Sequence, residues 1–129
     1  MTKWLMTASA AVMAGAGVVL ILMPQEILQW QGESASFREI LLVQLAGTLY
    51  FAFAMINWMG KSNLIGGVFG RSVAFGNLTH FAVGALTLLK ATNAHPDVAA
   101  LWVITAVYTL FAILFAFVIF RNPGLQQCG

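Results

Sequence analysis

Hydrophobic residues gather in four long runs that are separated by short polar connections. The runs cover approximately residues 4–23, 40–59, 73–90 and 99–120. Each run approaches or exceeds the roughly 20 apolar residues that an α-helix needs to cross a hydrocarbon layer about 30 Å thick. The pattern therefore predicts an all-α integral membrane protein whose four spanning helices form a four-helix bundle.

The composition points to the same environment. Of the 129 residues, 60% are hydrophobic and only 8% are charged, and the mean hydropathy is +0.88. A water-soluble chain of this length could not bury so much apolar surface. Because the connections are too short to fold independently, we expect a single transmembrane domain over residues 1–129. The first run is longer than the core of a secretory signal and lacks a small-x-small cleavage site, so we expect it to be a retained span.

The basic residues are distributed unevenly between the connections. Four of them lie at the amino terminus, in the middle connection and just after the fourth run: Lys3, Lys61, Arg71 and Arg121. The first and third connections hold Arg38 and Lys90, together with the acids Glu26, Glu33, Glu39 and Asp97. The positive-inside rule therefore predicts that both termini and the middle connection are cytoplasmic. A net charge of +2 is too small to indicate a nucleic-acid partner, so the expected partner is the lipid bilayer.

Several local signals predict where the helices end and how they pack. Pro24 ends the first helix, and residues 25–31 suit a short segment at the membrane interface. Ser36 and Glu39 have the spacing of a capping box before the second span. In the first span, alanine and glycine recur at a spacing of four residues, as at 10/14 and 11/15. Small residues on one face let helices approach closely in lipid, so we expect this span to pack tightly.

The most informative polar residue inside the runs is His80, near the middle of the third. At 100° per residue, a stripe about 100° wide collects small and polar side chains on this helix. Its members are Gly76, Asn77, His80, Gly84 and Thr87. A histidine in hydrocarbon is costly to charge and needs a hydrogen-bond partner even when it is neutral. The stripe is therefore predicted to face protein rather than lipid.

Other polar side chains lie on the second and fourth spans. Those on the second are Gln44, Thr48, Tyr50 and Asn57, and those on the fourth at the depth of His80 are Thr105, Tyr108 and Thr109. Two interpretations remain open. In one, His80 and Asn77 form interhelical hydrogen bonds that hold the bundle together. In the other, His80 titrates or contacts a ligand, and the same polar groups line a path for a small solute.

No cofactor or metal site is expected. A haem with two axial histidines is disfavoured because His95, the second histidine, lies in the outer connection and far from the depth of His80. No acid or thiol shares the depth of His80, so catalysis by a charge-relay set is disfavoured too, and no catalytic residue is predicted. Cys128, the one cysteine, is expected to be an ordinary thiol near the end of the chain.

The middle connection is basic and rich in glycine. Gly60, Gly66, Gly67 and Gly70 accompany Lys61 and Arg71. Backbone N–H groups beside two cations can bind an anion, so Lys61 and Arg71 are candidates for contact with a lipid headgroup or another anionic ligand. The alternative is a tight cytoplasmic turn with Phe69 at the interface.

Two stretches look like parts of uncharacterised bacterial membrane proteins. The first runs from Asn57 to Lys61 and on through Gly66 and Gly67, and the second runs from Gly76 through Phe81 to Gly84. In length and number of spans the chain resembles the DoxX-like group of small bacterial inner-membrane proteins. The resemblance implies a multi-pass protein of the inner membrane, and no active site is carried over from it.

Taken together, these patterns favour a non-enzymatic protein that forms an oligomer or serves as an accessory subunit of a larger membrane complex. The alternative is a carrier or channel for a small solute, with His80, Asn77 and Asn57 along the path. A lipid- or quinone-linked membrane enzyme is the third possibility, and it is disfavoured because no acid and base groups converge.

Overall fold

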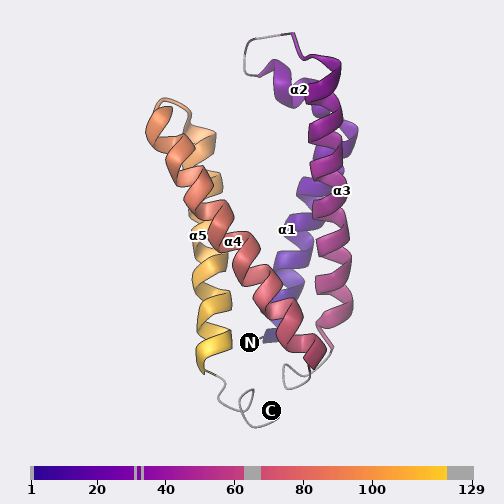
Figure 1. Cartoon of the computed structure of the whole chain (residues 1–129), viewed down its shortest axis with the longest axis vertical. Helices are drawn as coiled ribbons and strands as arrows, with labels where there is room; N and C mark the ends of the chain where they lie inside the picture. The colour runs from indigo at the N-terminus through magenta and orange to yellow at the C-terminus, as the bar shows by residue number, and fades with distance from the viewer. Residues whose placement is uncertain (1, 31, 33, 63–67, 122–129) are drawn as a thin grey trace. The chain divides into compact units, whose positions relative to one another are not determined.

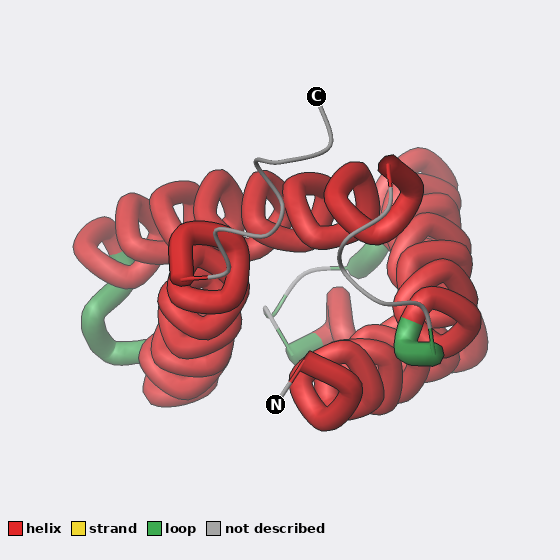
Figure 2. Tube along the Cα trace, turned by 90° about the horizontal axis from the view of Figure 1, so that it is seen from below, coloured by secondary structure: helices red, strands yellow, loops and turns green. Residues whose placement is uncertain are grey.

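The computed structural model describes residues 2–30, 32, 34–62 and 68–121. In this part of the chain every regular element is a helix, and four helices are long and apolar enough to cross a membrane. They are Thr2–Leu22, Phe37–Gly60, Phe69–Ala94 and Ala99–Arg121. The prediction of an all-helical fold with four spans is thereby confirmed, and the chain is a small multi-pass membrane protein. Figure 2 shows the described helices in red and the described turns in green.

The chain divides into two compact units, one with three helices and one with two. The first unit holds α1 (Thr2–Leu22), α2 (Pro24–Gln29) and α3 (Phe37–Gly60), with α1 and α3 antiparallel (Figure 1). The second unit holds α4 (Val68–Ala94) and α5 (Ala99–Arg121), which form an antiparallel hairpin. That residues 1–129 act as a single domain stays a prediction.

Proline and glycine set the path of the chain between α1 and α3. Helix α1 ends at Leu22, and Pro24 opens the short helix α2, where a proline is tolerated because the first N–H groups of a helix have no intrahelical partner. The segment predicted to lie at the interface is thus helical over Pro24–Gln29. Gly32 has a φ of +87°, a conformation that side chains with a Cβ rarely adopt. It redirects the chain before α3.

The predicted capping box is present at the start of α3. The backbone N–H of Ser36 donates to Oε2 of Glu39 at 2.8 Å, and the Ser36 hydroxyl accepts from the backbone N–H of Glu39 at 3.4 Å. Two N–H groups at the helix start are thereby satisfied. The helix begins at Phe37, three residues before the predicted span, because the capping residues determine the helix start whereas hydropathy marks only the apolar part.

Helices α1 and α3 cross at two glycines. A Cβ on Gly17 would lie 2.9 Å from both the carbonyl oxygen of Gly47 and the backbone nitrogen of Phe51. A Cβ on Gly47 would lie 3.0 Å from the Gly17 carbonyl oxygen and 2.9 Å from the side chain of Leu20. The helix backbones are therefore in direct contact here, which is the close approach that small residues permit in lipid.

On α1 the small residues divide between two faces. Ala10 and Gly17 are buried, whereas Ala11 and Gly15 are exposed, and nothing lies within 4 Å of a Cβ built on Gly15. The buried residues of α1 recur at intervals of three or four and mark the packed face: Leu5, Met6, Ser9, Ala10, Met13 and Gly17. The predicted tight packing is thus found on one of the two small-residue faces.

Helix α4 is longer than its predicted span at both ends, running over Val68–Ala94 rather than residues 73–90. Arg71, Ser72 and Lys90 are polar enough to end an apolar run, but none of them breaks a helix. The helix stops just before Pro96, which cannot continue it. The structure therefore assigns Thr92 to the spanning helix, although it lies outside the predicted span.

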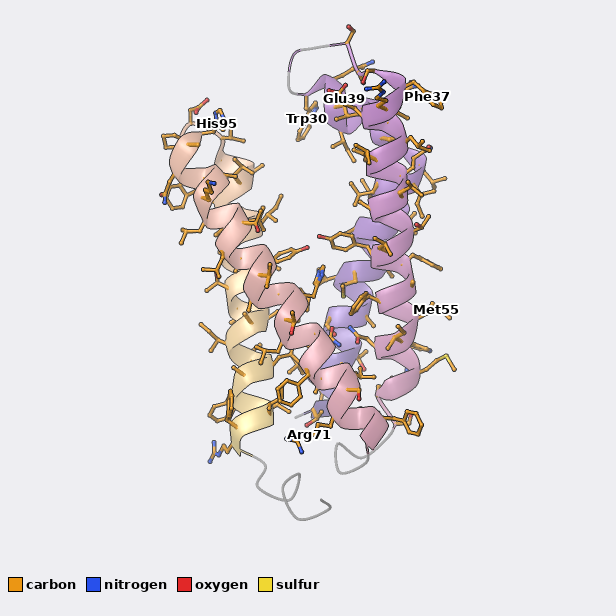
Figure 3. All side chains as sticks on the ribbon, in the orientation of Figure 1. Trp30, Phe37, Glu39, Met55, Arg71 and His95 are labelled. Carbon is orange, nitrogen blue, oxygen red and sulfur yellow. The ribbon has the colours of Figure 1, made fainter. Side chains whose placement is uncertain are left out.

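Large apolar side chains cover the outside of both units. Leu42 and Leu49 on α3 are 65% and 66% exposed, and Leu86 on α4 is 69% exposed. Phe37 and Met55 point outward from α3 in Figure 3. Exposure of such an apolar surface to water would be strongly unfavourable, whereas lipid tails solvate it.

Candidate functional site

The predicted site residue His80 contacts Tyr108 in the second unit. His80 is half-buried near the middle of α4, Tyr108 is buried near the middle of α5, and Tyr108 Oη lies 3.4 Å from His80 Nε2. Either group can donate, depending on the histidine tautomer. The contact is at the long end of the range for hydrogen bonds, and the ring centres are 5.6 Å apart. Of the three polar groups expected at this depth on the fourth span, Tyr108 is thus the one that meets His80.

An aromatic cluster lies beside this pair. The ring of Phe81 stacks on Phe111 and Phe115, with centres 4.9 Å and 5.8 Å away, and meets the Tyr108 ring edge-on at 5.3 Å. Phe81 and Phe115 are each 1% exposed. The rings fill the space between α4 and α5, so they fix the position of Tyr108.

Gly84 provides the space for Tyr108. A Cβ at this position would lie 2.5 Å and 2.6 Å from two carbons of the tyrosine ring. The ring therefore packs directly against the backbone of α4, one turn beyond His80. This explains a glycine within the polar stripe of the sequence, since a larger residue would displace the ring.

Most of the other predicted polar groups bond to backbone carbonyl groups. Asn77 Nδ2 donates to the carbonyl oxygen of Val73 at 2.9 Å, and the Thr109 hydroxyl donates to that of Thr105 at 2.8 Å. Such bonds to the preceding turn satisfy a polar side chain without a second helix.

In the first unit, two predicted residues bond to backbone carbonyls in different ways. The exposed Thr48 hydroxyl donates to the carbonyl oxygen of Leu45 at 2.7 Å within α3. The Gln44 side chain donates to the carbonyl oxygen of Ile21 at 3.3 Å and so joins α3 to α1. Tyr50 lies half-buried on α3 in this unit.

Asn57 has the most deeply buried polar contacts in the first unit. Its Nδ2 donates to the Ser9 hydroxyl at 3.1 Å and contacts Met13 Sδ at 3.6 Å, while the Ser9 hydroxyl donates to the Met6 carbonyl oxygen at 3.0 Å. Ser9 and Asn57 are both 0% exposed. Ser9 was not among the predicted residues, although its hydroxyl stands among the alanines of the first run and the start of α1 lies beside the end of the antiparallel α3 that holds Asn57.

A second buried hydroxyl pair joins α4 to α5. The oxygens of Thr92 and Thr105 are 2.9 Å apart, and each hydroxyl also lies within hydrogen-bond distance of a carbonyl oxygen on its own helix. Thr92 was missed because the predicted third span stopped at Lys90. The last four residues of α4, which follow the predicted apolar run, therefore include one residue that bonds to α5.

The basic candidates contact aromatic rings on their own helices. Lys61 Nζ lies 2.8 Å from the ring centre of Trp58, and Arg71 Cζ lies 5.7 Å from that of Phe75. Gly66 and Gly67, expected to offer backbone N–H groups to an anion, lie outside the described residues, as do Glu33 and Cys128.

The polar side chains of both units offer hydrogen bonds, and the His80 imidazole can take up a proton. Among residues 2–30, 32, 34–62 and 68–121, no three histidine, cysteine, aspartate or glutamate side chains come together to hold a metal ion. His80 with Tyr108 can exchange a proton or bind one polar group of a small molecule. Asn57 with Ser9, and Thr92 with Thr105, supply hydrogen bonds between helices.

Comparison of the sequence with protein-family models and with curated proteins, and of the fold with solved structures, found no significant match.

Proposed function

We propose that the chain is a non-enzymatic protein of the bacterial inner membrane that forms an oligomer or serves as an accessory subunit of a membrane complex. Both termini and the connection between α3 and α4 face the cytoplasm, in accordance with the distribution of lysine and arginine. The spans then act through their packing rather than through a reaction.

The observation that carries this proposal is the pairing of polar groups inside each unit. Asn57 bonds to Ser9 across α1 and α3, and Thr92 bonds to Thr105 across α4 and α5. Every buried side-chain nitrogen and oxygen in the described part of the chain has a hydrogen-bond partner. Groups committed to one another stabilise helix contacts, whereas a pathway or catalytic centre directs polar groups toward a solute.

Assembly can be tested by substitutions on the exposed face of α1 that holds the small residues Ala11 and Gly15. We expect the protein extracted with its surrounding lipid by a maleic-acid copolymer to contain more than one copy of the chain, or further proteins. The double substitution Ala11→Leu with Gly15→Leu is expected to reduce the particle mass, because leucine keeps backbones apart where alanine and glycine let them approach. Mass photometry of the particles measures this.

The control for that experiment is Leu42→Ala, a change of side-chain size on an exposed face of α3. It is expected to leave the particle mass unchanged. Particles that hold one copy of the unmodified chain and no other protein would contradict the proposal.

A carrier or channel is the second candidate, and the contact of His80 with Tyr108 favours it. A half-buried histidine and a tyrosine in the middle of a span are groups that can pass a proton or hold a solute. The 3.4 Å between Tyr108 Oη and His80 Nε2 is longer than the 2.9 Å between Thr92 and Thr105 and the 3.1 Å between Asn57 and Ser9, so this contact is the weakest of the three.

The two candidates differ in what His80→Ala changes. If the spans act through packing, this substitution lowers the melting temperature by a few degrees, since contacts with Tyr108 and Phe81 are lost. Proton permeability of liposomes, followed with an entrapped pH-sensitive dye, is then the same with the unmodified and substituted proteins. A permeability that depends on His80 would favour the carrier instead.

A further inference from the structure

Three basic side chains lie over aromatic rings, each on its own helix. The pairs are Lys61 Nζ over Trp58 at 2.8 Å, Arg71 Cζ over Phe75 at 5.7 Å and Arg121 Cζ over Phe117 at 4.9 Å from the ring centre. A cation within about 6 Å of a ring face is attracted by the ring quadrupole. Trp58, Phe75 and Phe117 are also partly exposed, at 51%, 40% and 43%. Three of the four spanning helices thus have a basic side chain over an aromatic ring near one end.

The order of the two residues along the chain depends on the direction of the helix. In α3 and α5 the aromatic residue precedes the cation, by three and four residues, and both pairs are at the helix end. In α4 the cation precedes the aromatic residue by four, and the pair is at the helix start. In every case, therefore, the ring lies about one turn, or roughly 5 Å, closer to the middle of the helix than the cation.

The two ends of each unit differ in charge. Lys61 shares its end of the first unit with Lys3, because α1 and α3 are antiparallel, and Arg71 shares its end of the second unit with Arg121. In the described residues, no acid lies at these ends. Figure 3 shows Arg71 and His95 at opposite ends of α4, and Glu39 at the start of α3.

The other ends of the units have mixed charge. The first unit has Arg38 with Glu26 and Glu39 at that end. Lys90 and Asp97 lie at the corresponding end of the second unit. An anionic surface would therefore attract one end of each unit and not the other.

We propose that Lys61, Arg71 and Arg121, each placed over its aromatic ring, bind the phosphate groups of anionic phospholipids in the cytoplasmic leaflet. Aromatic rings are favoured at the level of the headgroups, so a ring one turn deeper than its cation places that cation beside the phosphates. Lysine and arginine then donate charge-assisted hydrogen bonds to the phosphate oxygens. The inference goes beyond the proposed function, rests on it only for the cytoplasmic placement of these helix ends, and applies whether the protein assembles or acts alone.

Free anions are the less suitable occupant. Each cation lies beside an aromatic ring, which adds no hydrogen-bond donor for a soluble anion but suits the level of the lipid headgroups. A lipid leaflet presents many phosphates at one depth, which suits separate cations at matching helix ends.

The test compares two matched charge variants of the full chain. K61Q/R71Q and R38Q/K90Q each remove one lysine and one arginine, from opposite ends of the units. Native mass spectrometry of the detergent-solubilised protein, titrated with phosphatidylglycerol or with phosphatidylcholine of the same acyl chains, gives the affinities. We expect the unmodified protein to prefer phosphatidylglycerol, and K61Q/R71Q to weaken that binding about 25-fold, at about fivefold per basic residue. R38Q/K90Q is expected to change it less than about twofold.

A second variant separates the role of the rings from that of the charges. W58L/F75L keeps every basic residue but removes two of the rings, and it is expected to weaken phosphatidylglycerol binding because the cations lose their placement. Equal losses in the two charge variants would overturn the proposal. Equal affinity of the unmodified protein for the two lipids, or displacement of phosphatidylglycerol by an equal concentration of inorganic phosphate, would overturn it as well.

Discussion

Replacement of Gly17 by alanine is expected to lower the free energy of unfolding by about 2 kcal/mol, the typical cost of forcing extra atoms into a packed contact. The added methyl group would lie 2.9 Å from the Gly47 carbonyl oxygen and from the Phe51 nitrogen, and 3.2 Å from Phe51 Cα. All three atoms belong to backbone and cannot rotate away, so α1 and α3 have to separate. In lipid, close packing is a main source of helix association, and the separation removes it along both helices. Unfolding in mixed micelles of increasing dodecyl sulfate content measures the loss.

Gly15 offers a control two residues away on the same helix. Nothing in the chain lies within 4 Å of a Cβ built there, so Gly15→Ala adds the same methyl group without a clash between α1 and α3, and alanine is still a small residue on the face proposed for assembly. Alanine is the better helix former by up to about 1 kcal/mol, so this variant should be as stable as the unmodified protein or more stable. If the two substitutions had equal effects, the close crossing of α1 and α3 would be refuted.

Replacement of Asn57 by alanine is expected to cost about 2 kcal/mol of stability. The substitution removes the hydrogen bond to Ser9 and the contact with Met13, and leaves a cavity at a position that is 0% exposed. Hydrogen bonds between membrane helices contribute about 0.5–2 kcal/mol, and the cavity adds to the loss. The melting temperature in detergent gives a first measure, and reversible unfolding gives the free energy.

A double-mutant cycle with Ser9→Ala isolates the bond itself. If Asn57 and Ser9 interact as the structure places them, the two losses are non-additive by about 1 kcal/mol. Thr48→Ala is the matched control on α3, because the exposed Thr48 hydroxyl bonds to its own helix, and it should change stability by less than about 0.5 kcal/mol. Strictly additive losses for Asn57 and Ser9 would show that their hydrogen bond contributes nothing.

Much of the fold follows from the sequence, because lipid restricts the choice so strongly. An apolar run of about 20 residues in hydrocarbon has to satisfy its own backbone, and a helix does so. The ends of the helices follow from different rules. Pro24 and the Ser36–Glu39 capping box were readable, whereas the extension of α4 to Ala94 was not, because hydropathy falls at Lys90 while helix propensity does not.

The polar contacts of α5 were predictable in depth only in part, and their rotation was not predictable. Matching positions along antiparallel helices placed Thr105, Tyr108 and Thr109 near the level of His80, and Tyr108 does contact it. The depth prediction was wrong for Thr105, which bonds to Thr92, twelve residues or roughly 18 Å farther along α4. Helix rotation depends on side-chain packing between α4 and α5, here on the stacked rings of Phe81 and Phe115. No periodicity in a single sequence carries that information when every face is apolar. The roles proposed for these residues stay predictions.

The pairing inside each unit has a consequence for how the protein is made. Asn57 bonds to Ser9, Thr105 to Thr92, and Tyr108 contacts His80. In each pair the second residue comes earlier in the chain, so it leaves the ribosome first. When a polar residue of α3 or α5 enters the membrane, a helix with a matching hydroxyl or ring nitrogen is already there. Insertion can therefore proceed as two successive hairpins, and the first can bond its polar side chains before α4 and α5 enter the membrane.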